Sequence, residues 1–408
     1  MRWLKFIVVC LLLFPLSGCW DRGEITQFAF PVVLGLDEGE DGLLEITMQI
    51  ANARGVAPKM EASSGTEPSE IITISAPDLL SAREMANISV TKDIRYSHVK
   101  NIVISENLAR SREFPSIMEA TLRDRQFRRD INVVISREKA SDFIRNNNPQ
   151  LEERPHKFFA FMLERWEQTG LMPEATLNQY FKEIDGKDGL FLSIYATSTI
   201  KEPEVKEDED YIAGEVDLSG GNPTQMIGSA VFKDGRMVGV MSGEETRHSL
   251  LLRPYAKVNT IQTNFKDPND PAKAITVRML KNESPKVNIN MEKEKGTISV
   301  VIPVIIQVLH IPGETNYTEN IQHQATLKKS IEQQLKNESK SLIRKSQRIF
   351  KAEPFLWSSI ARGNFWTWTE YEKFDWSDYF SNSKVNIKYD VTIDRYGKYL
   401  YSEREKRL

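Results

Sequence analysis

The sequence predicts a multidomain protein of mixed α/β and α+β class, with mixed sheets and flanking helices. Three observations support this fold class. The chain has 408 residues, which is long for a single hydrophobic core. Strand-like and helix-like segments alternate between residues 75 and 145, as in an α/β layer. A long amphipathic segment at residues 316–350 follows several strand-like runs, which predicts a C-terminal α+β domain with a long helix packed on a mostly antiparallel sheet.

Residues 1–18 are expected to form a signal peptide. Arg2 and Lys5 precede an apolar run that is shorter than the ~20 residues needed to span a bilayer. Leu16, Ser17, Gly18 and Cys19 then resemble a bacterial lipobox, in which the chain is cleaved between Gly18 and Cys19 and the Cys carries a diacylglycerol with acyl chains such as palmitate. We therefore predict cleavage at this bond and lipidation of Cys19. The alternative is a free Cys behind an ordinary signal peptide.

The predicted N-terminal α/β domain covers residues 19–145. Strand-like runs at 28–36 and 43–51 flank an acidic, glycine-containing turn, which predicts a hairpin. Residues 55–70 are expected to form a loop, after which Ser75 and Pro77 resemble the first turn of a helix. Two further strand and helix pairs follow. They are "HVKNIVIS" with "FPSIMEATLRD", and "DINVVIS" with "EKASDFIRN".

A middle subdomain is predicted at residues 146–200 and a charged linker at 201–215. Two helices within 152–184 are separated by Gly170 and Pro173, and "GLFLSIYATSTI" then predicts a strand. The linker contains "KEPEVKEDEDY", which has no apolar face.

Residues 216–408 are predicted to form the C-terminal domain. Alternating runs on both sides of Asp234-Gly235 indicate a hairpin, and strands are expected at 254–263, 273–281, 285–291 and 297–310. The longest apolar run, residues 298–311, contains Pro303 and is too short to span a membrane, so we interpret it as a buried strand. The long helix is expected to lie across a sheet made of residues 224–240, 273–281, 297–310 and 385–393.

Composition and motifs argue against catalysis and against nucleic-acid binding. The formal charge is −3, without a large basic stripe. The histidines show no metal-ligand spacing, and no nucleophile elbow, phosphate-binding loop or dinucleotide fingerprint is present. Cys10 would leave with the signal peptide, so a mature chain would hold only the lipidated Cys19. We therefore expect no enzyme activity, no cofactor and no metal.

Two segments are candidates for contacts with partners. Residues 353–380 carry four of the seven tryptophans, Trp357, Trp366, Trp368 and Trp376. Tryptophan is enriched in interface hot spots, but these side chains are equally suited to cover the core around the long helix. The basic segment "LRDRQFRRD", residues 122–130, is either a solvated helix end or a docking patch for an acidic partner.

Several segments, in order along the chain, resemble the Ger(x)C family, the C-subunit lipoproteins of spore nutrient germinant receptors. They are "CWD" with Glu24-Ile25, "VVLGLDEGEDG", "HVKNIVISENLAR", "LRDRQFRRDINVVISREKASDFI", "GSAVFKDGRMVGVMSGEET" and "LIRKSQRIFKAE". One segment departs from the family pattern, because Glu353 to Trp357 replace the usual glycine-aromatic run after the long helix.

The resemblance implies a non-catalytic, lipid-anchored subunit on the outer face of the inner spore membrane. It implies two integral-membrane partners, the A and B subunits, in a complex that triggers germination in response to small nutrients. The alternative is a solute-binding lipoprotein of a transporter. That alternative predicts two similar lobes with a ligand cleft between them, whereas the second half of this chain is rich in strands and holds one long helix.

Overall fold

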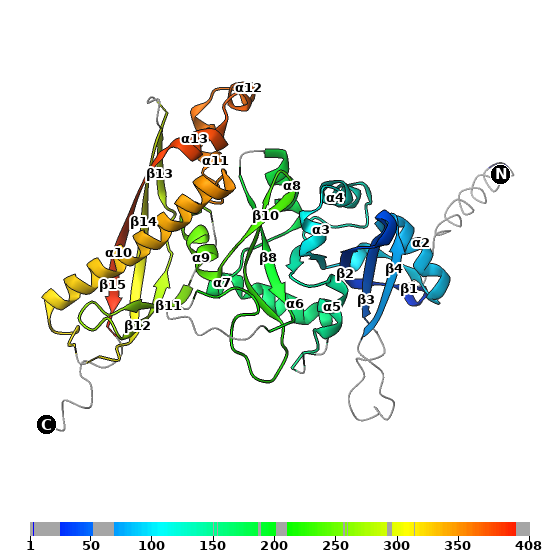
Figure 1. Ribbon diagram of the computed structural model, residues 1–408, viewed down its shortest axis with the longest axis horizontal. Coiled ribbons are helices and arrows are strands. Elements are labelled where there is room, and N and C mark those ends of the chain that lie inside the picture. Colours follow the sequence, from blue (N-terminus) through cyan, green and yellow to red (C-terminus); the bar gives the residue numbers. More distant parts are fainter. Residues whose placement is uncertain are drawn as a thin grey trace.

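The computed structural model describes residues 25–51, 69–149, 151–152, 154–186, 189–200, 210–255, 258, 260–291, 296–313 and 315–396, together with Trp3. The predicted sites at Gly18 and Cys19 and most of the predicted linker lie outside these residues. The molecule is elongated, with its N-terminal half at one end and its C-terminal half at the other (Figure 1). Mixed sheets with flanking helices confirm the predicted fold class.

The N-terminal half is built on an eight-stranded sheet in the order β10-β9-β8-β7-β6-β2-β3-β4. The strands are β2 (Pro31–Glu38), β3 (Leu44–Ala51), β4 (Ser69–Ala76), β6 (Asn101–Ser105), β7 (Asn132–Ser136), β8 (Phe191–Thr197), β9 (Gln225–Lys233) and β10 (Arg236–Met241). β2, β6, β7 and β8 run parallel to one another, and antiparallel strands extend the sheet at both edges. Burial of both faces explains why the parallel strands have almost continuous apolar sequences.

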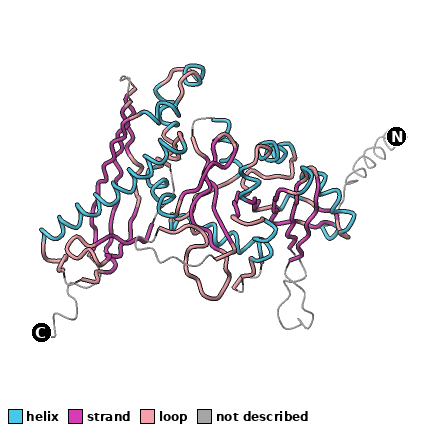
Figure 2. The backbone as a smooth tube through the Cα atoms, in the orientation of Figure 1, coloured by secondary structure: helices cyan, strands magenta, loops and turns pink. Residues whose placement is uncertain are grey.

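Helices cover this sheet, as Figure 2 shows. They are α2 (Leu79–Ser89), α3 (Glu106–Arg110), α4 (Phe114–Arg123), α5 (Ala140–Asn146), α6 (Pro155–Glu164), α7 (Trp166–Thr169) and α8 (Leu177–Gly186). The segment at 152–184 thus forms three helices where two were predicted. A small parallel pair, β1 (Phe28–Ala29) with β5 (Asp93–Ile94), lies beside α2.

The predicted hairpin of β2 and β3 is confirmed, but the predicted helix start at Ser75 is wrong. Ser75 lies in β4, which pairs with β3 along its whole length. The N-cap of α2 is instead Asp78, whose carboxylate accepts hydrogen bonds from the backbone N–H groups of Leu80 and Ser81, both at 2.8 Å. Alternation in "SEIITISA" therefore indicates a strand that immediately precedes the helix cap.

The C-terminal half holds a five-stranded sheet and the long helix. Its elements are α9 (Gly243–Leu252), β11 (Thr260–Lys266), β12 (Ala274–Leu280), β13 (Lys286–Asn290), β14 (Thr297–His310), α10 (Ile321–Lys345), the π-helical turn η6 (Ser346–Phe350), α11 (Ser358–Ala361), η7 (Arg362–Asn364), α12 (Trp368–Glu372), α13 (Trp376–Asn382) and β15 (Lys384–Arg395). The sheet is mostly antiparallel, and only β14 and β15 pair in parallel.

The long helix α10 packs on this sheet, as predicted. Its buried apolar side chains recur mainly at four- and seven-residue steps and belong to the second core: Leu327, Ile331, Leu335, Leu342 and Ile343. β14 buries every second side chain along most of its length, so its apolar run is the strand at the centre of a sheet. Pro303 lies between the stretch that pairs with β13 and the stretch that pairs with β12. A residue without an N–H group is tolerated at this change of partner.

The predicted place of residues 224–240 in the C-terminal sheet is wrong. β9 pairs with β8, so the hairpin of β9 and β10 extends the eight-stranded sheet. Alternate side chains explain the error, because Ala230 and Phe232 enter the first core while Val231 enters the second. β9 therefore lies between the two cores and contributes side chains to both of them. The proposed domain boundaries stay a prediction.

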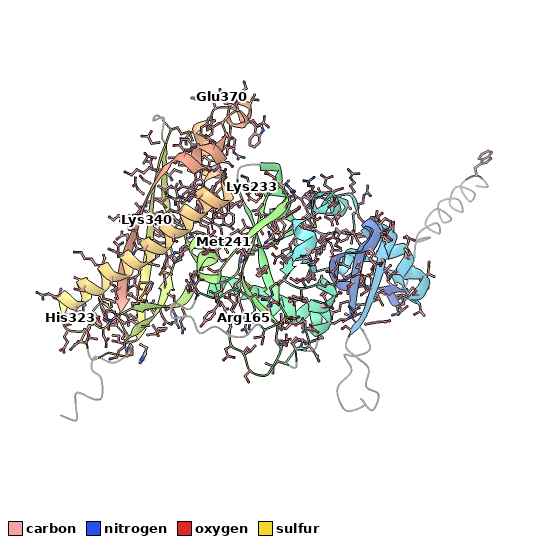
Figure 3. All side chains as sticks on the ribbon, in the orientation of Figure 1. Arg165, Lys233, Met241, His323, Lys340 and Glu370 are labelled. Atoms are coloured by element: carbon pink, nitrogen blue, oxygen red, sulfur yellow. The ribbon has the colours of Figure 1, made fainter. Side chains whose placement is uncertain are left out.

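The same hairpin is joined to the end of the long helix. Figure 3 labels Lys233 on it, between the two halves. The Lys233 ammonium group donates hydrogen bonds to the carbonyls of Phe350 and Lys351, at 3.3 and 3.0 Å, where the helical segment ends and a cation is favourable. A Cβ atom on Gly239 would lie 2.8 Å from the Phe350 ring. Gly239 thus allows the ring to pack directly on the β10 backbone.

Candidate functional site

The aromatic segment, residues 353–380, leaves the long helix and forms a helical projection at one end of the C-terminal half (Figure 1). Glu370 labels this projection in Figure 3. Short helices α11, α12 and α13 build it, and η7 lies between the first two. Two pairs of tryptophans within it have opposite environments.

Trp357 and Trp376 are completely buried, so their side chains face the core. The Trp357 indole N–H donates to the carbonyl of Leu252 at 3.0 Å, and its ring packs against Phe355 at a centroid distance of 4.6 Å. Trp376 stacks on Tyr379 at 5.6 Å. Of the two roles expected for the aromatic segment, these two side chains have the one that covers the core, and they anchor the projection to it.

Trp366 and Trp368 are exposed, with 97% and 50% of their surface accessible. Thr367, between them, caps α12 in a reciprocal capping box with Glu370. The Arg362 guanidinium group lies over the Trp368 ring at 5.4 Å. The backbone below both indoles is thus held by hydrogen bonds, while their apolar surface faces solvent. Such a fixed, exposed aromatic pair has the chemistry of an interface anchor.

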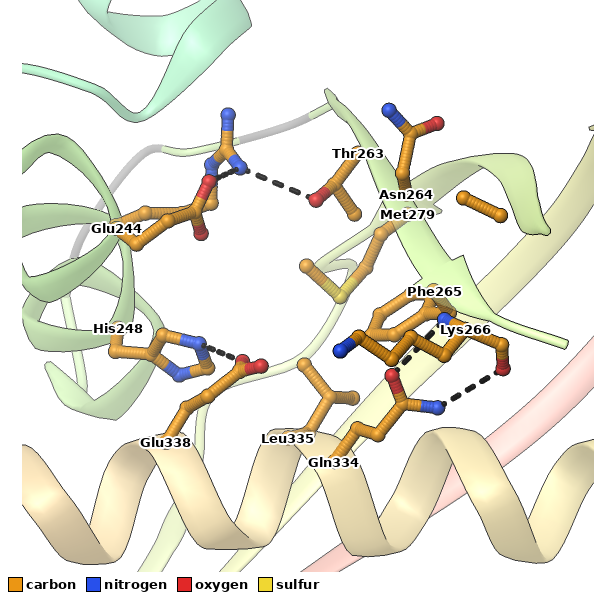
Figure 4. A pocket seen from close by; sticks show the side chains of 12 residues that line it. Glu244, His248, Thr263, Asn264, Phe265, Lys266, Met279, Gln334, Leu335 and Glu338 are labelled. Carbon is orange, nitrogen blue, oxygen red and sulfur yellow. Dashed lines mark hydrogen bonds and ion pairs between the residues drawn. The ribbon is translucent and has the colours of Figure 1, made fainter. Parts of the chain in front are cut away.

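A second candidate is a polar cavity between α9, β11 and α10, drawn in Figure 4. Arg247 is buried and forms an ion pair with Glu244, and it donates to the Thr263 hydroxyl at 3.2 Å. His248 is also buried and contacts the Ser339 hydroxyl at 3.0 Å and the Glu338 carboxylate at 2.7 Å. Burial raises the pKa of Glu244, and the neighbouring Arg247 opposes this shift.

This cavity does not have the properties of a nutrient site. Its volume is about 120 Å³, whereas sites for small ligands usually have ~300–1,000 Å³. The polar side chains named above already bind one another, so the arrangement stabilises the contact between α9 and α10. Within the described residues, no group of three or more His, Cys, Asp or Glu side chains is placed to hold a metal ion.

A buried carboxyl group at the junction of the two halves was missed by sequence reasoning. Glu353 is completely buried, and its carboxylate accepts from the backbone N–H groups of Phe355 at 2.5 Å and Ser358 at 2.9 Å. Its own carbonyl accepts from the Leu190 N–H at 3.1 Å. Burial raises the pKa of Glu353 to about 8. A Glu-Pro pair inside an apolar aromatic run was the available signal, and it marks a buried turn.

No described helix is both long enough and apolar enough to cross a bilayer.

Two family models match most of the chain. One, described as "Spore germination protein N-terminal domain", matches residues 21–197. The other, described as "Spore germination B3/ GerAC like, C-terminal", matches residues 227–397. The chain belongs to the Ger(x)C family of spore germination proteins. The resemblance stated from the sequence is thereby confirmed.

Individual relatives of this Ger(x)C protein agree with the family match. Spore germination protein B3 of Bacillus subtilis (strain 168) is 24% identical over 395 residues, which cover 95% of this chain and 96% of the relative. Spore germination protein KC of the same organism is 25% identical over 146 residues, or 35% of this chain and 36% of the relative. A structure described as "Crystal Structure of the GerBC protein" aligns with a TM-score of 0.53 at 16% identity, covering 89% of this chain and 96% of that one. The structural likeness supports the fold.

Proposed function

We propose that this Ger(x)C protein is a lipid-anchored, non-catalytic subunit of a membrane germinant receptor complex that is needed for nutrient-triggered spore germination. The single observation that carries the proposal is the match of both family models, in order, over most of the chain. The lipobox ending at Cys19 supports an anchor on the outer face of the inner spore membrane. The satisfied polar cavity supports a scaffolding role over direct catalysis.

The anchor is tested by Cys19→Ala. We expect the variant to incorporate no radiolabelled acyl chain and either to keep its signal peptide or to leave the membrane fraction of spores, because two or more acyl chains are needed for stable anchoring. Nutrient-triggered germination through this receptor should fall to the level of a strain without the gene. Cys10→Ala is the matched control and should behave as wild type. A Cys19→Ala protein that remained membrane-bound, without lipid label and with full germination, would contradict the anchor.

The proposed partners are the integral-membrane A and B subunits of the receptor. Trp366 and Trp368 are the proposed docking residues, because they are the exposed half of the aromatic segment. Trp366→Ala should lower co-purification of the A and B subunits from spore membranes by about tenfold, the scale of a hot-spot residue. The melting temperature of the protein should change little, since 97% of the Trp366 surface is accessible.

Trp357→Ala is the informative control for this experiment. Its side chain is buried, so we expect a large fall in melting temperature, and any loss of partner binding should follow the loss of folded protein. If Trp366→Ala and Trp368→Ala both lowered the melting temperature and caused no separate loss of binding, the docking role would be refuted.

A further inference from the structure

An apolar face of α2 lies at the end of the molecule where the N-terminal segment leaves the described fold. Three exposed side chains share it, Leu80, Met85 and Ile88, with 41%, 45% and 85% of their surface accessible. The opposite face of α2 buries Leu79 and Ala86 against the first core. The solvent side of α2 thus carries three apolar side chains, which spread over about 140° of the helix with Glu84 between Leu80 and Ile88.

The exit of the chain is fixed close to this face. Asn87 on α2 accepts a hydrogen bond from the Ile94 backbone N–H at 2.9 Å. Ile94 belongs to β5, which pairs with β1, and β1 begins at Phe28. Figure 1 shows α2 and β1 together at one end of the long axis. Residues 20–25 would join Cys19 to the fold, and six residues reach at most ~20 Å. A lipid on Cys19 would thus hold this end near the bilayer.

A loop that is rich in basic residues is attached to the flank of α2. The loop after α4 is attached here, because Gln126 accepts from the Tyr96 N–H at 2.7 Å and Asp124 pairs with Arg83 of α2 at 3.1 Å. Exposed basic residues in this neighbourhood have no ion pair among the described residues: Lys92, Arg123, Arg125 and Arg129. The acidic residue on the outer face of α2, Glu84, lies 3.7 Å from the Arg83 guanidinium group.

We propose that this end of the protein, the exposed face of α2 with the basic loop at residues 122–130, binds directly to anionic lipid headgroups. The inference rests on the proposed lipid anchor for its orientation. Apolar side chains flanked by Lys and Arg are the composition of interfacial helices, in which the apolar groups enter the headgroup region and the cations contact anionic lipid. The anchor and the surface would together fix how the protein stands on the membrane.

The test uses the unacylated chain of residues 20–408, so its outcome does not depend on lipidation. Sedimentation with vesicles of phosphatidylcholine containing about 30% phosphatidylglycerol should show binding that weakens as salt is raised. Ile88→Glu should lower the partition coefficient about tenfold, and Arg125→Glu with Arg129→Glu should do the same. Matched controls at the other half are Ile349→Glu, at a side chain 68% exposed, and Lys384→Glu with Lys388→Glu. These should bind as wild type.

Three results would overturn the inference: no binding of the wild type, equal binding to pure phosphatidylcholine, or equal losses in the control variants. If the wild type did not bind vesicles, residues 122–130 would remain a candidate docking patch for an acidic protein. Acylation of Cys19 combined with no vesicle binding would refute only this inference. If the protein bound vesicles but its Cys19 was never acylated in the cell, the proposed anchor would be refuted and the proposed lipid-binding surface would stand.

Discussion

Leu335→Asp is expected to abolish the fold of the C-terminal half. Leu335 is 1% exposed and lies in the middle of the buried stripe of α10. Removing the apolar side chain would cost ~2–5 kcal/mol as in a Leu→Ala change, and an unpaired buried carboxylate would add several kcal/mol.

Thermal unfolding followed by circular dichroism measures this effect. A fall of at least ~10 °C, or loss of the cooperative transition, is expected from a change of ~4 kcal/mol or more. Asn337→Asp is the matched control, because it adds the same charge on the same helix at an exposed position. Leu335→Met should cost less than ~1.5 kcal/mol because it conserves volume. A Leu335→Asp melting temperature close to that of Asn337→Asp would show that α10 does not cover the sheet in solution.

Glu353→Ala is expected to destabilise the junction of the two halves by ~2–6 kcal/mol. The substitution leaves the buried N–H groups of Phe355 and Ser358 without their acceptor, and each unsatisfied group costs ~1–3 kcal/mol. Glu353→Gln keeps one of the two acceptor oxygens, so it should lose only one of these hydrogen bonds and cost less than Glu353→Ala. Chemical denaturation of both variants measures the difference, and equal losses in the two would contradict the capping role.

The pH dependence of stability tests the same group independently. Burial raises the pKa of Glu353 from 4.5 to about 8, so the folded state holds a proton that the unfolded state releases between these values. Stability should therefore fall as the pH rises from about 4.5 to about 8 and then stop falling. Glu353→Gln should flatten this slope, and an unchanged slope would refute the assignment.

The pH dependence of stability expected from Lys281 has the opposite sign. Its ammonium group donates to the carbonyls of Leu250 and Arg253, at 3.0 and 2.6 Å. Burial lowers the pKa of Lys281 from 10.5 to about 7, so the unfolded state binds the extra proton above pH 7. Its contribution to stability should rise with pH from about 7 to 10.5. Lys281→Met should remove this rise and leave the acidic slope in place.

Elements with strong periodicity were predicted correctly from the sequence. Features that depend on which segments pack against each other were not. The stripe of α10 and the hairpin at Asp234-Gly235 follow from local patterns, because one apolar face or one turn specifies each of them. The sheet to which that hairpin belongs does not, since β9 is apolar on both faces. The alternation of side chains along β9 does not show which of the two cores each face of the strand packs against.

The aromatic segment shows the same limit. All four tryptophans have the same chemistry, and only the tertiary structure separates Trp357 and Trp376, which fill the core, from Trp366 and Trp368, which face solvent. The burial of Glu353 is harder to predict from the sequence, because carboxyl groups are rarely buried. Its burial follows from backbone N–H groups that meet in space and show no sequence pattern of their own.

The parallel pairing of β14 with β15 has a consequence for the order in which the protein folds. Thr297 pairs with Lys384, about ninety residues later in the chain. All strands of the eight-stranded sheet end by Met241, so their pairing is able to form while the remainder is still being synthesised. The second sheet must wait for its last strand, and closing so long a loop is slow. Until then one edge of β14 stays open to strands of other molecules, so a chaperone that shields it should increase the yield of native protein.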